Sequence, residues 1–133
     1  MSYKVQYDKD QVNVAIHKIS FSINTLMSHF ENQDIVFLTI IEGGAYLTGK
    51  VMDLLPDQYK RRIINKSIKI SSYHENKQGQ IKFDYIPNID LKDRIVVVLD
   101  DFCDSGHTIN KLNQYLKECG VQSSHFFTLL GRK

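Results

Sequence analysis

The stretch that most constrains the fold is Arg94 followed by a valine-rich apolar run, residues 95–99, that ends in two adjacent carboxylates, Asp100 and Asp101. Such a run is typical of a strand buried on both faces of a parallel sheet. Residues 104–108 (Asp-Ser-Gly-His-Thr) then form a turn that leads into a helical pattern. Free backbone N–H groups, two hydroxyls and a helix N-terminus are suited to binding a phosphate. Because ligands of such sheets bind beyond the carboxyl ends of the strands, we expect the two acids to lie there, beside the phosphate.

Two interpretations of this stretch are open. Carboxylates for hydroxyls or a metal, next to a phosphate-binding turn, describe a sugar-phosphate site. The simpler interpretation is an ordinary strand–turn–helix junction in which Asp104 and Ser105 cap the helix. The acidic pair ahead of the turn favours the first interpretation.

The rest of the chain alternates between helical and strand patterns. Residues 9–30 place apolar side chains at three- and four-residue steps, which predicts an amphipathic helix. Further helices are predicted over 45–55 and over 108–119, where Gly120 ends the helix, and strands over 35–41, 63–73, 94–99 and 124–130. The polar residues 73–85 have the composition of a mobile loop or an exposed hairpin. The predicted fold class is α/β, a single domain over residues 1–133 with a mainly parallel, twisted sheet flanked by helices.

Composition and charge argue against several function classes. A net charge of +2 with interspersed acids and bases does not favour a nucleic-acid partner. Residues 59–69 form the one basic cluster, which we interpret as a solvated approach to a strand or as a region that attracts anions. No apolar run is long enough to span a membrane, and the N-terminus lacks the apolar core of a signal peptide. Cys103 and Cys119 make neither a disulfide framework nor a zinc site, so we expect a cytoplasmic protein.

Residues 94–108 resemble the phosphoribosyl-diphosphate motif of the type I phosphoribosyltransferases, with Ser105 in place of the usual first threonine of the loop. Two other loops are similar to those of the hypoxanthine-guanine phosphoribosyltransferases, in the same order along the chain. Glu42-Gly43-Gly44 resembles the pyrophosphate loop, which contains a cis peptide in the family, and Ser72-Tyr73 resembles the pair in the flexible loop that covers the active site. The resemblance implies a phosphoribosyltransferase that uses Mg²⁺ and binds phosphoribosyl diphosphate or a nucleoside 5′-monophosphate.

The resemblance also implies a role for each matching residue. Asp100 and Asp101 would contact the ribose hydroxyls directly or through Mg²⁺, and Asp104 would exchange a proton with N7 of a purine. The 5′-phosphate cradle would consist of Asp104, Ser105, Gly106, His107 and Thr108. Gly43 and Gly44 would let the backbone approach the pyrophosphate closely. Glu42 stands where relatives usually have Lys or Arg, so its carboxylate would need a bridging Mg²⁺ or would point toward a partner subunit.

The resemblance runs from about Ile35 to Lys133, and we expect no full hood, the segment that recognises the base in the family. Three interpretations follow: a minimal transferase acting on a base, with a purine favoured as in purine salvage; a non-catalytic module that binds a phosphoribosyl ligand and regulates or scaffolds another protein; and a hydrolase that uses the same carboxylates on a nucleotide. Retention of the three acids favours catalysis, whereas Glu42 and the missing hood favour the non-catalytic module. We also expect a homodimer, or a partner protein that completes the base site, docked on the apolar helix 45–55.

Overall fold

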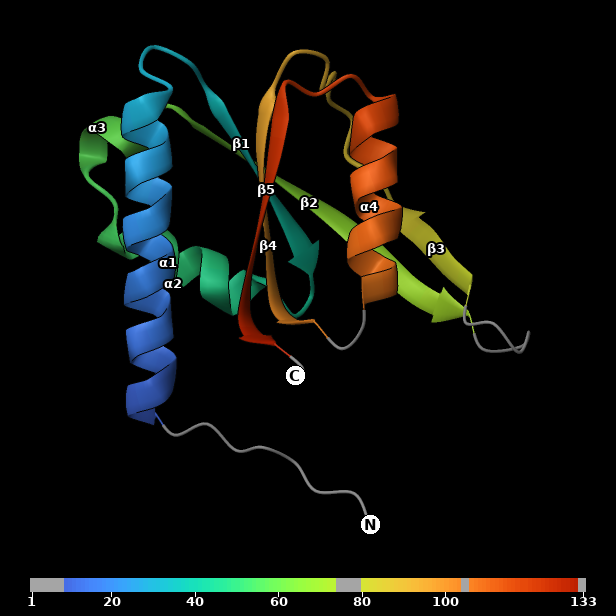
Figure 1. Ribbon diagram of the computed structural model, residues 1–133, viewed down its shortest axis with the longest axis horizontal. Coiled ribbons are helices and arrows are strands. Elements are labelled where there is room, and N and C mark those ends of the chain that lie inside the picture. The colour runs from blue at the N-terminus through green and yellow to red at the C-terminus, as the bar shows by residue number, and fades with distance from the viewer. Residues whose placement is uncertain (1–8, 74–79, 104–105, 132–133) are drawn as a thin grey trace.

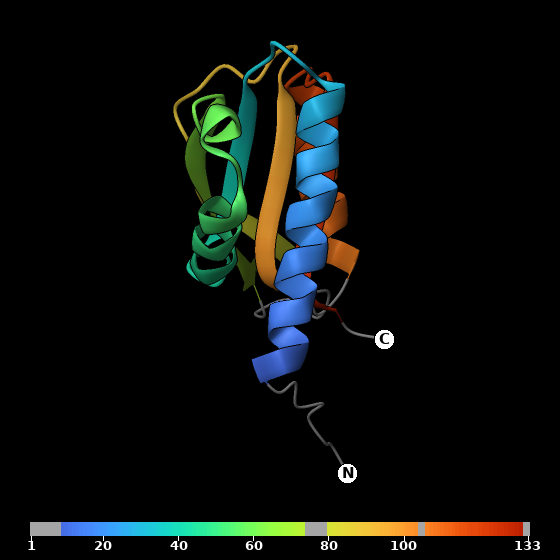
Figure 2. The ribbon, with the colours of Figure 1, turned by 90° about the vertical axis from the view of Figure 1, so that its left-hand side faces the viewer.

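The computed structural model describes residues 9–73, 80–103 and 106–131. The elements in chain order are α1 (Lys9–His29), β1 (Ile35–Ile41), α2 (Ala45–Leu54), α3 (Asp57–Lys60), β2 (Ile63–Tyr73), β3 (Gln80–Tyr85), β4 (Ile95–Cys103), α4 (Gly106–Glu118) and β5 (Ser123–Gly131). Figure 1 shows the sheet between α1, α2 and α3 on one side and α4 on the other. Figure 2 shows α1 and α2 side by side over the same face.

The five strands form one sheet in the order β3-β2-β1-β4-β5. β1 pairs in parallel with β2 and with β4, and β4 pairs in parallel with β5. Only β3 is antiparallel, because a short connection returns the chain directly beside β2. The predicted α/β class with a mainly parallel sheet flanked by helices is confirmed, and the polar stretch predicted as a loop or hairpin contains a hairpin strand.

The strands are apolar on both faces because helices cover both faces. Along β4, Ile95, Val97 and Leu99 belong to the core beneath α1 and α2, whereas Val96 and Val98 belong to the core beneath α4. The apolar stripe predicted for the first helix faces the first core through Ile16, Ile19 and Ile23, with Val12, Leu26 and Phe30 partly buried against it. Alternate residues of β4 therefore point to different helical layers.

Several element boundaries differ from the sequence prediction. β4 continues to Cys103, four residues beyond the predicted end, because β5 runs beside it and pairs Phe102 with Leu130. Helix α4 begins at Gly106 rather than Thr108, and the short helix α3 was not predicted. Gly120 follows α4 with φ +78° and donates its N–H to the Lys117 carbonyl, as expected of a glycine at a helix C-terminus.

Candidate phosphoribosyl site

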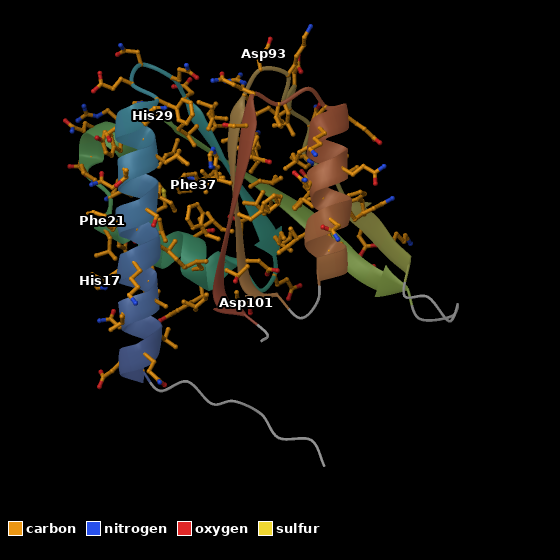
Figure 3. All side chains as sticks on the ribbon, in the orientation of Figure 1. His17, Phe21, His29, Phe37, Asp93 and Asp101 are labelled. Carbon is orange, nitrogen blue, oxygen red and sulfur yellow. The ribbon has the colours of Figure 1, made fainter. Side chains whose placement is uncertain are left out.

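The candidate site lies at one edge of the sheet, where three parallel strands end. The loop 42–44 follows β1, the hairpin containing Ser72 and Tyr73 is at the end of β2, and α4 follows β4. Figure 3 shows Asp101 at this edge and Asp93 at the opposite edge. The sequence prediction that these loops share one side of the sheet is borne out by the parallel pairing.

The two acids of the motif lie inside β4, not in a loop beyond it, which corrects the position expected from the sequence. Asp100 pairs with Thr128 of β5, so the ladder extends past the apolar run. Since side chains alternate along a strand, Asp101 continues the row of Val97 and Leu99 toward α1 and α2, and Asp100 continues the row of Val98 toward α4. The pair therefore supplies one carboxylate to each layer, and an Asp100 carboxylate oxygen accepts the Asp101 N–H at 2.9 Å.

Gly43 brings the loop after β1 into contact with the end of β4. A methyl group at Gly43 would lie 2.7 Å from Cγ and 2.8 Å from Oδ2 of Asp101, which is closer than non-bonded atoms approach. The strand register is consistent with this contact: Thr39 of β1 pairs with Leu99 of β4, so the residues that follow them in the two strands lie next to each other. The glycine is therefore what allows the Asp101 carboxylate to sit directly against the loop backbone.

Gly44 is buried and fixes the start of α2. A methyl group there would lie 2.5 Å from the Leu99 carbonyl oxygen and 2.8 Å from the Ile40 carbonyl oxygen. The Gly44 N–H donates to Ile40 O at 2.7 Å, and the Ala45 N–H donates to Glu42 O at 3.2 Å. These two amides are engaged inside the loop.

Glu42 begins the loop with an exposed side chain, and the Ile41–Glu42 peptide bond is cis, as the resemblance implied for this loop. A pair of hydroxyls that sequence reasoning missed anchors the same region: Thr39 and Thr48 are hydrogen-bonded at 2.6 Å, and Thr39 is buried. The available signal was a lone threonine in an otherwise apolar strand. The bond ties α2 to β1 directly behind the loop.

The hairpin of β2 and β3 extends beyond the other strand ends. Ile41, the last residue of β1, pairs with Lys69, so β2 continues for four more residues, about 13 Å, to Tyr73. The backbone of Ser72 pairs with Ile81 and that of Tyr73 with Gln80. The pair resembling the flexible loop thus occupies the projecting end of a hairpin at the site edge.

The turn 104–108, predicted to bind a phosphate, is described only in part. Asp104 and Ser105 lie outside the described residues, as do residues 74–79. Gly106, His107 and Thr108 form the first turn of α4, three residues after β4 ends, and Thr108 is half-buried. The first turn of a helix leaves backbone N–H groups unpaired, and the helix dipole favours an anion there.

Within the described ranges, no group of three or more His, Cys, Asp or Glu side chains is placed to hold a metal ion. Mg²⁺ does not need one, because it accepts one or two carboxylates and completes its shell with water and substrate oxygens. Asp101, beside the loop 42–44, and Asp100, on the opposite face of the sheet, can each supply one such carboxylate. None of the described helices is long and apolar enough to cross a membrane.

Comparisons with known proteins agree with this geometry. Residues 6–133 match the family model of the phosphoribosyl transferase domain, and the chain belongs to that family. The family supports phosphoribosyltransferase activity for this chain. A search of curated protein sequences found no match.

Three solved structures show the same fold at low sequence identity. The hypoxanthine-guanine phosphoribosyltransferase of Bacillus anthracis is 18% identical with a TM-score of 0.80, over 98% of this chain and 75% of that one. The hypoxanthine phosphoribosyltransferase of Staphylococcus aureus is 14% identical with a TM-score of 0.78, over 97% of this chain and 67% of that one. The purine phosphoribosyltransferase of Pyrococcus horikoshii is 19% identical with a TM-score of 0.70, over 96% and 87% of the two chains.

Proposed function

We propose that this protein transfers phosphoribose between phosphoribosyl diphosphate and a nitrogenous base, with Mg²⁺, in the cytoplasm. A purine is the base we favour, because the structural neighbours named above are hypoxanthine, hypoxanthine-guanine and purine phosphoribosyltransferases. The observation that carries the proposal is the contact between Gly43 and the Asp101 carboxylate. It joins a loop suited to pyrophosphate to a carboxylate suited to ribose hydroxyls or Mg²⁺.

Each part of the substrate has a proposed partner. The 5′-phosphate binds at the turn 104–108, where the first turn of α4 supplies N–H groups and Thr108 a hydroxyl. The pyrophosphate lies along the loop 42–44, held by backbone groups other than the Gly44 amide, which is bonded to Ile40. The ribose lies between them, next to Asp100 and Asp101.

The carboxylates suit the charge that develops during transfer. Loss of pyrophosphate leaves positive charge on the ribose ring, and nearby carboxylates stabilise that charge when they are held in place beforehand. When bound, Mg²⁺ would neutralise the departing pyrophosphate. Asp104 is our candidate for proton transfer at the base nitrogen, and Ser72 and Tyr73, on the projecting hairpin, for excluding water from the site.

The decisive experiment is to incubate the protein with Mg²⁺, phosphoribosyl diphosphate and each of a panel of purine and pyrimidine bases, and to measure pyrophosphate release. We expect release that depends on one class of base and stops when EDTA removes the metal. Release without any base would indicate a hydrolase. Binding of phosphoribosyl diphosphate without release would indicate a non-catalytic module.

Phosphate binding is tested separately from catalysis. We expect the double variant Ser105→Ala, Thr108→Val to weaken binding of a nucleoside 5′-monophosphate, measured by calorimetry, because two hydroxyl donors are lost. Asp104→Asn should lower turnover more than it weakens this binding. Unchanged affinity in the double variant would contradict the assignment of the turn.

We further propose that the protein works as a dimer through the α2 side. We expected a partner to dock on the apolar helix 45–55, but its residues Leu47, Val51 and Leu55 are buried in the protein's own core. Tyr46 and Leu54 are 56% and 44% exposed, so a smaller apolar surface than expected is available to a partner. Light scattering at micromolar concentration tests the proposal, with Tyr46→Lys expected to shift the protein toward the monomer.

A further inference from the structure

Helix α4 packs against the hairpin as well as carrying the phosphate turn. The rings of Phe83 on β3 and Tyr115 on α4 have centroids 5.1 Å apart and an interplanar angle of 46°. Both side chains are partly buried against the core formed with Ile68, Leu112 and Leu116. The aromatic pair is therefore a fixed contact between two elements that both reach the candidate site.

The positions of the two rings connect them to the site. Phe83 pairs across the hairpin with Ile70, two residues before Ser72 on the same strand. Tyr115 lies seven residues, close to two full turns, after Thr108, so both project from the same face of α4. Along α4, the contact lies about two turns after the first turn of the helix. Along β2, it lies beside Ile70, three residues before the strand ends at Tyr73.

The Tyr115 side chain also interacts with Cys119. Burial, together with a hydrogen bond to the thiol of Cys119, the residue just after the end of α4, raises the pKa of Tyr115 to about 12. β3 is an edge strand of the sheet. It pairs with β2 on one side, and its Phe83 packs on the core beneath α4.

We infer that Phe83 and Tyr115 are positioning residues that hold the backbone of Ser72 and Tyr73, at the end of β2, at a fixed distance from the first turn of α4, residues 106–108. This inference rests on the proposed function. Its consequence is that binding of a phosphate at α4 and ordering of the end of β2 are coupled through one aromatic contact. Loosening the contact leaves the carboxylates of β4 unchanged but lets water reach the reacting sugar.

The test compares transfer with hydrolysis of phosphoribosyl diphosphate in Tyr115→Leu and Phe83→Leu. A purely structural weakening lowers both rates together. The inference predicts a rise in the ratio of hydrolysis to transfer of about two- to tenfold, the range that corresponds to the loss of one aromatic pair. Tyr115→Phe, which keeps the ring, should restore the wild-type ratio. The double variant Phe83→Leu, Tyr115→Leu should raise the ratio of hydrolysis to transfer no more than either single variant does, because both substitutions remove the same contact.

Phe126→Leu is the matched control. Phe126 packs on the same core from β5, on the opposite side of α4 from the hairpin, so the chemical change is the same and the hairpin contact is retained. We expect its ratio of hydrolysis to transfer to equal that of the wild type. A rise as large as that of Phe83→Leu would overturn the inference, as would an unchanged ratio in both hairpin variants.

Hydrogen exchange provides a readout independent of activity. With phosphoribosyl diphosphate and Mg²⁺ as the probe, we expect slower exchange of amides 69–73 in the wild type and in Tyr115→Phe. In Tyr115→Leu we expect the ligand to slow exchange at the start of α4 but not at 69–73. Equal protection of both segments in Tyr115→Leu overturns the coupling. Absence of any binding or turnover by the wild type contradicts instead the proposed function.

Discussion

The two edges of the sheet are built differently. At the edge opposite the site, loops are closed by internal hydrogen bonds: Arg62 donates to the carbonyls of Gln33, Met27 and Phe30 at 2.9, 3.1 and 2.6 Å. The Gln122 N–H also donates to Arg94 O at 2.8 Å. At the site edge the loop 42–44 has internal hydrogen bonds too, but in addition its glycine backbone packs closely against the Asp101 carboxylate and the Leu99 carbonyl. The edge with Arg62 stabilises the fold, and the edge with the loop 42–44 carries the polar groups of the proposed site.

The largest effect on activity should come from Gly43→Ala. The added methyl group cannot coexist with the Asp101 carboxylate, so that side chain must move from its place against the loop. We expect base-dependent pyrophosphate release to fall by about a hundredfold, since a displacement of about 1 Å at a reacting centre has that effect. The melting temperature should change little, because the atoms displaced are the end of one side chain.

Gly49→Ala is the control for that substitution. Gly49 lies in the same helix-and-loop segment, and a methyl group there has no atom within 4 Å. We expect full activity and a gain of about 0.5–1 kcal/mol in the free energy of unfolding. A loss of activity equal to that of Gly43→Ala would show that the effect is not local to the Asp101 contact.

Gly44→Ala should produce the largest loss of stability among the glycine substitutions. Its methyl group would meet two backbone carbonyl oxygens, and backbone does not move aside as a side chain does. Overpacking of this kind costs about 1–3 kcal/mol, measured by urea unfolding. A variant as stable as the wild type would mean that α2 can shift relative to β4.

Arg62→Ala tests the opposite edge. Loss of a guanidinium that bonds three carbonyls near the end of α1 should lower the free energy of unfolding by about 1.5–3 kcal/mol. Its neighbour Arg61 is exposed and provides the matched control, with Arg61→Ala expected to be close to neutral. Activity per folded molecule should be unchanged in both. If Arg62→Ala impaired turnover without loss of stability, the division between the two edges would be wrong.

The smallest effect concerns pH. Burial lowers the pKa of His125 below its ordinary value of 6.5. The unfolded chain therefore takes up a proton at higher pH than the folded protein does, and stability falls as the pH drops below about 6.5. His125→Gln should remove this part of the dependence, seen as a smaller decrease in the urea midpoint between pH 7 and pH 5.5.

Local pattern was enough to predict most of the strands and helices and the common edge of the site. The apolar run 95–99 and the helix stripe of Ile16, Ile19 and Ile23 depend on burial periodicity, which the sequence carries directly. The sequence also predicted that Gly120 ends the last helix, because a helix C-terminus often needs a residue with positive φ, which glycine adopts without strain.

Only the tertiary structure decided how the acidic pair is divided. Pairing with β5 extends β4 through Asp100 and Asp101, and strand alternation then sends one carboxylate to each helical layer. The contact of Gly43 with Asp101 and that of Phe83 with Tyr115 join residues far apart in the chain. Sequence alone determined which groups this protein has for the proposed sugar-phosphate site, because residue type and local pattern follow directly from the order of residues along the chain. Their distances depend on which strands become neighbours, and that is settled only when the sheet and its helices pack.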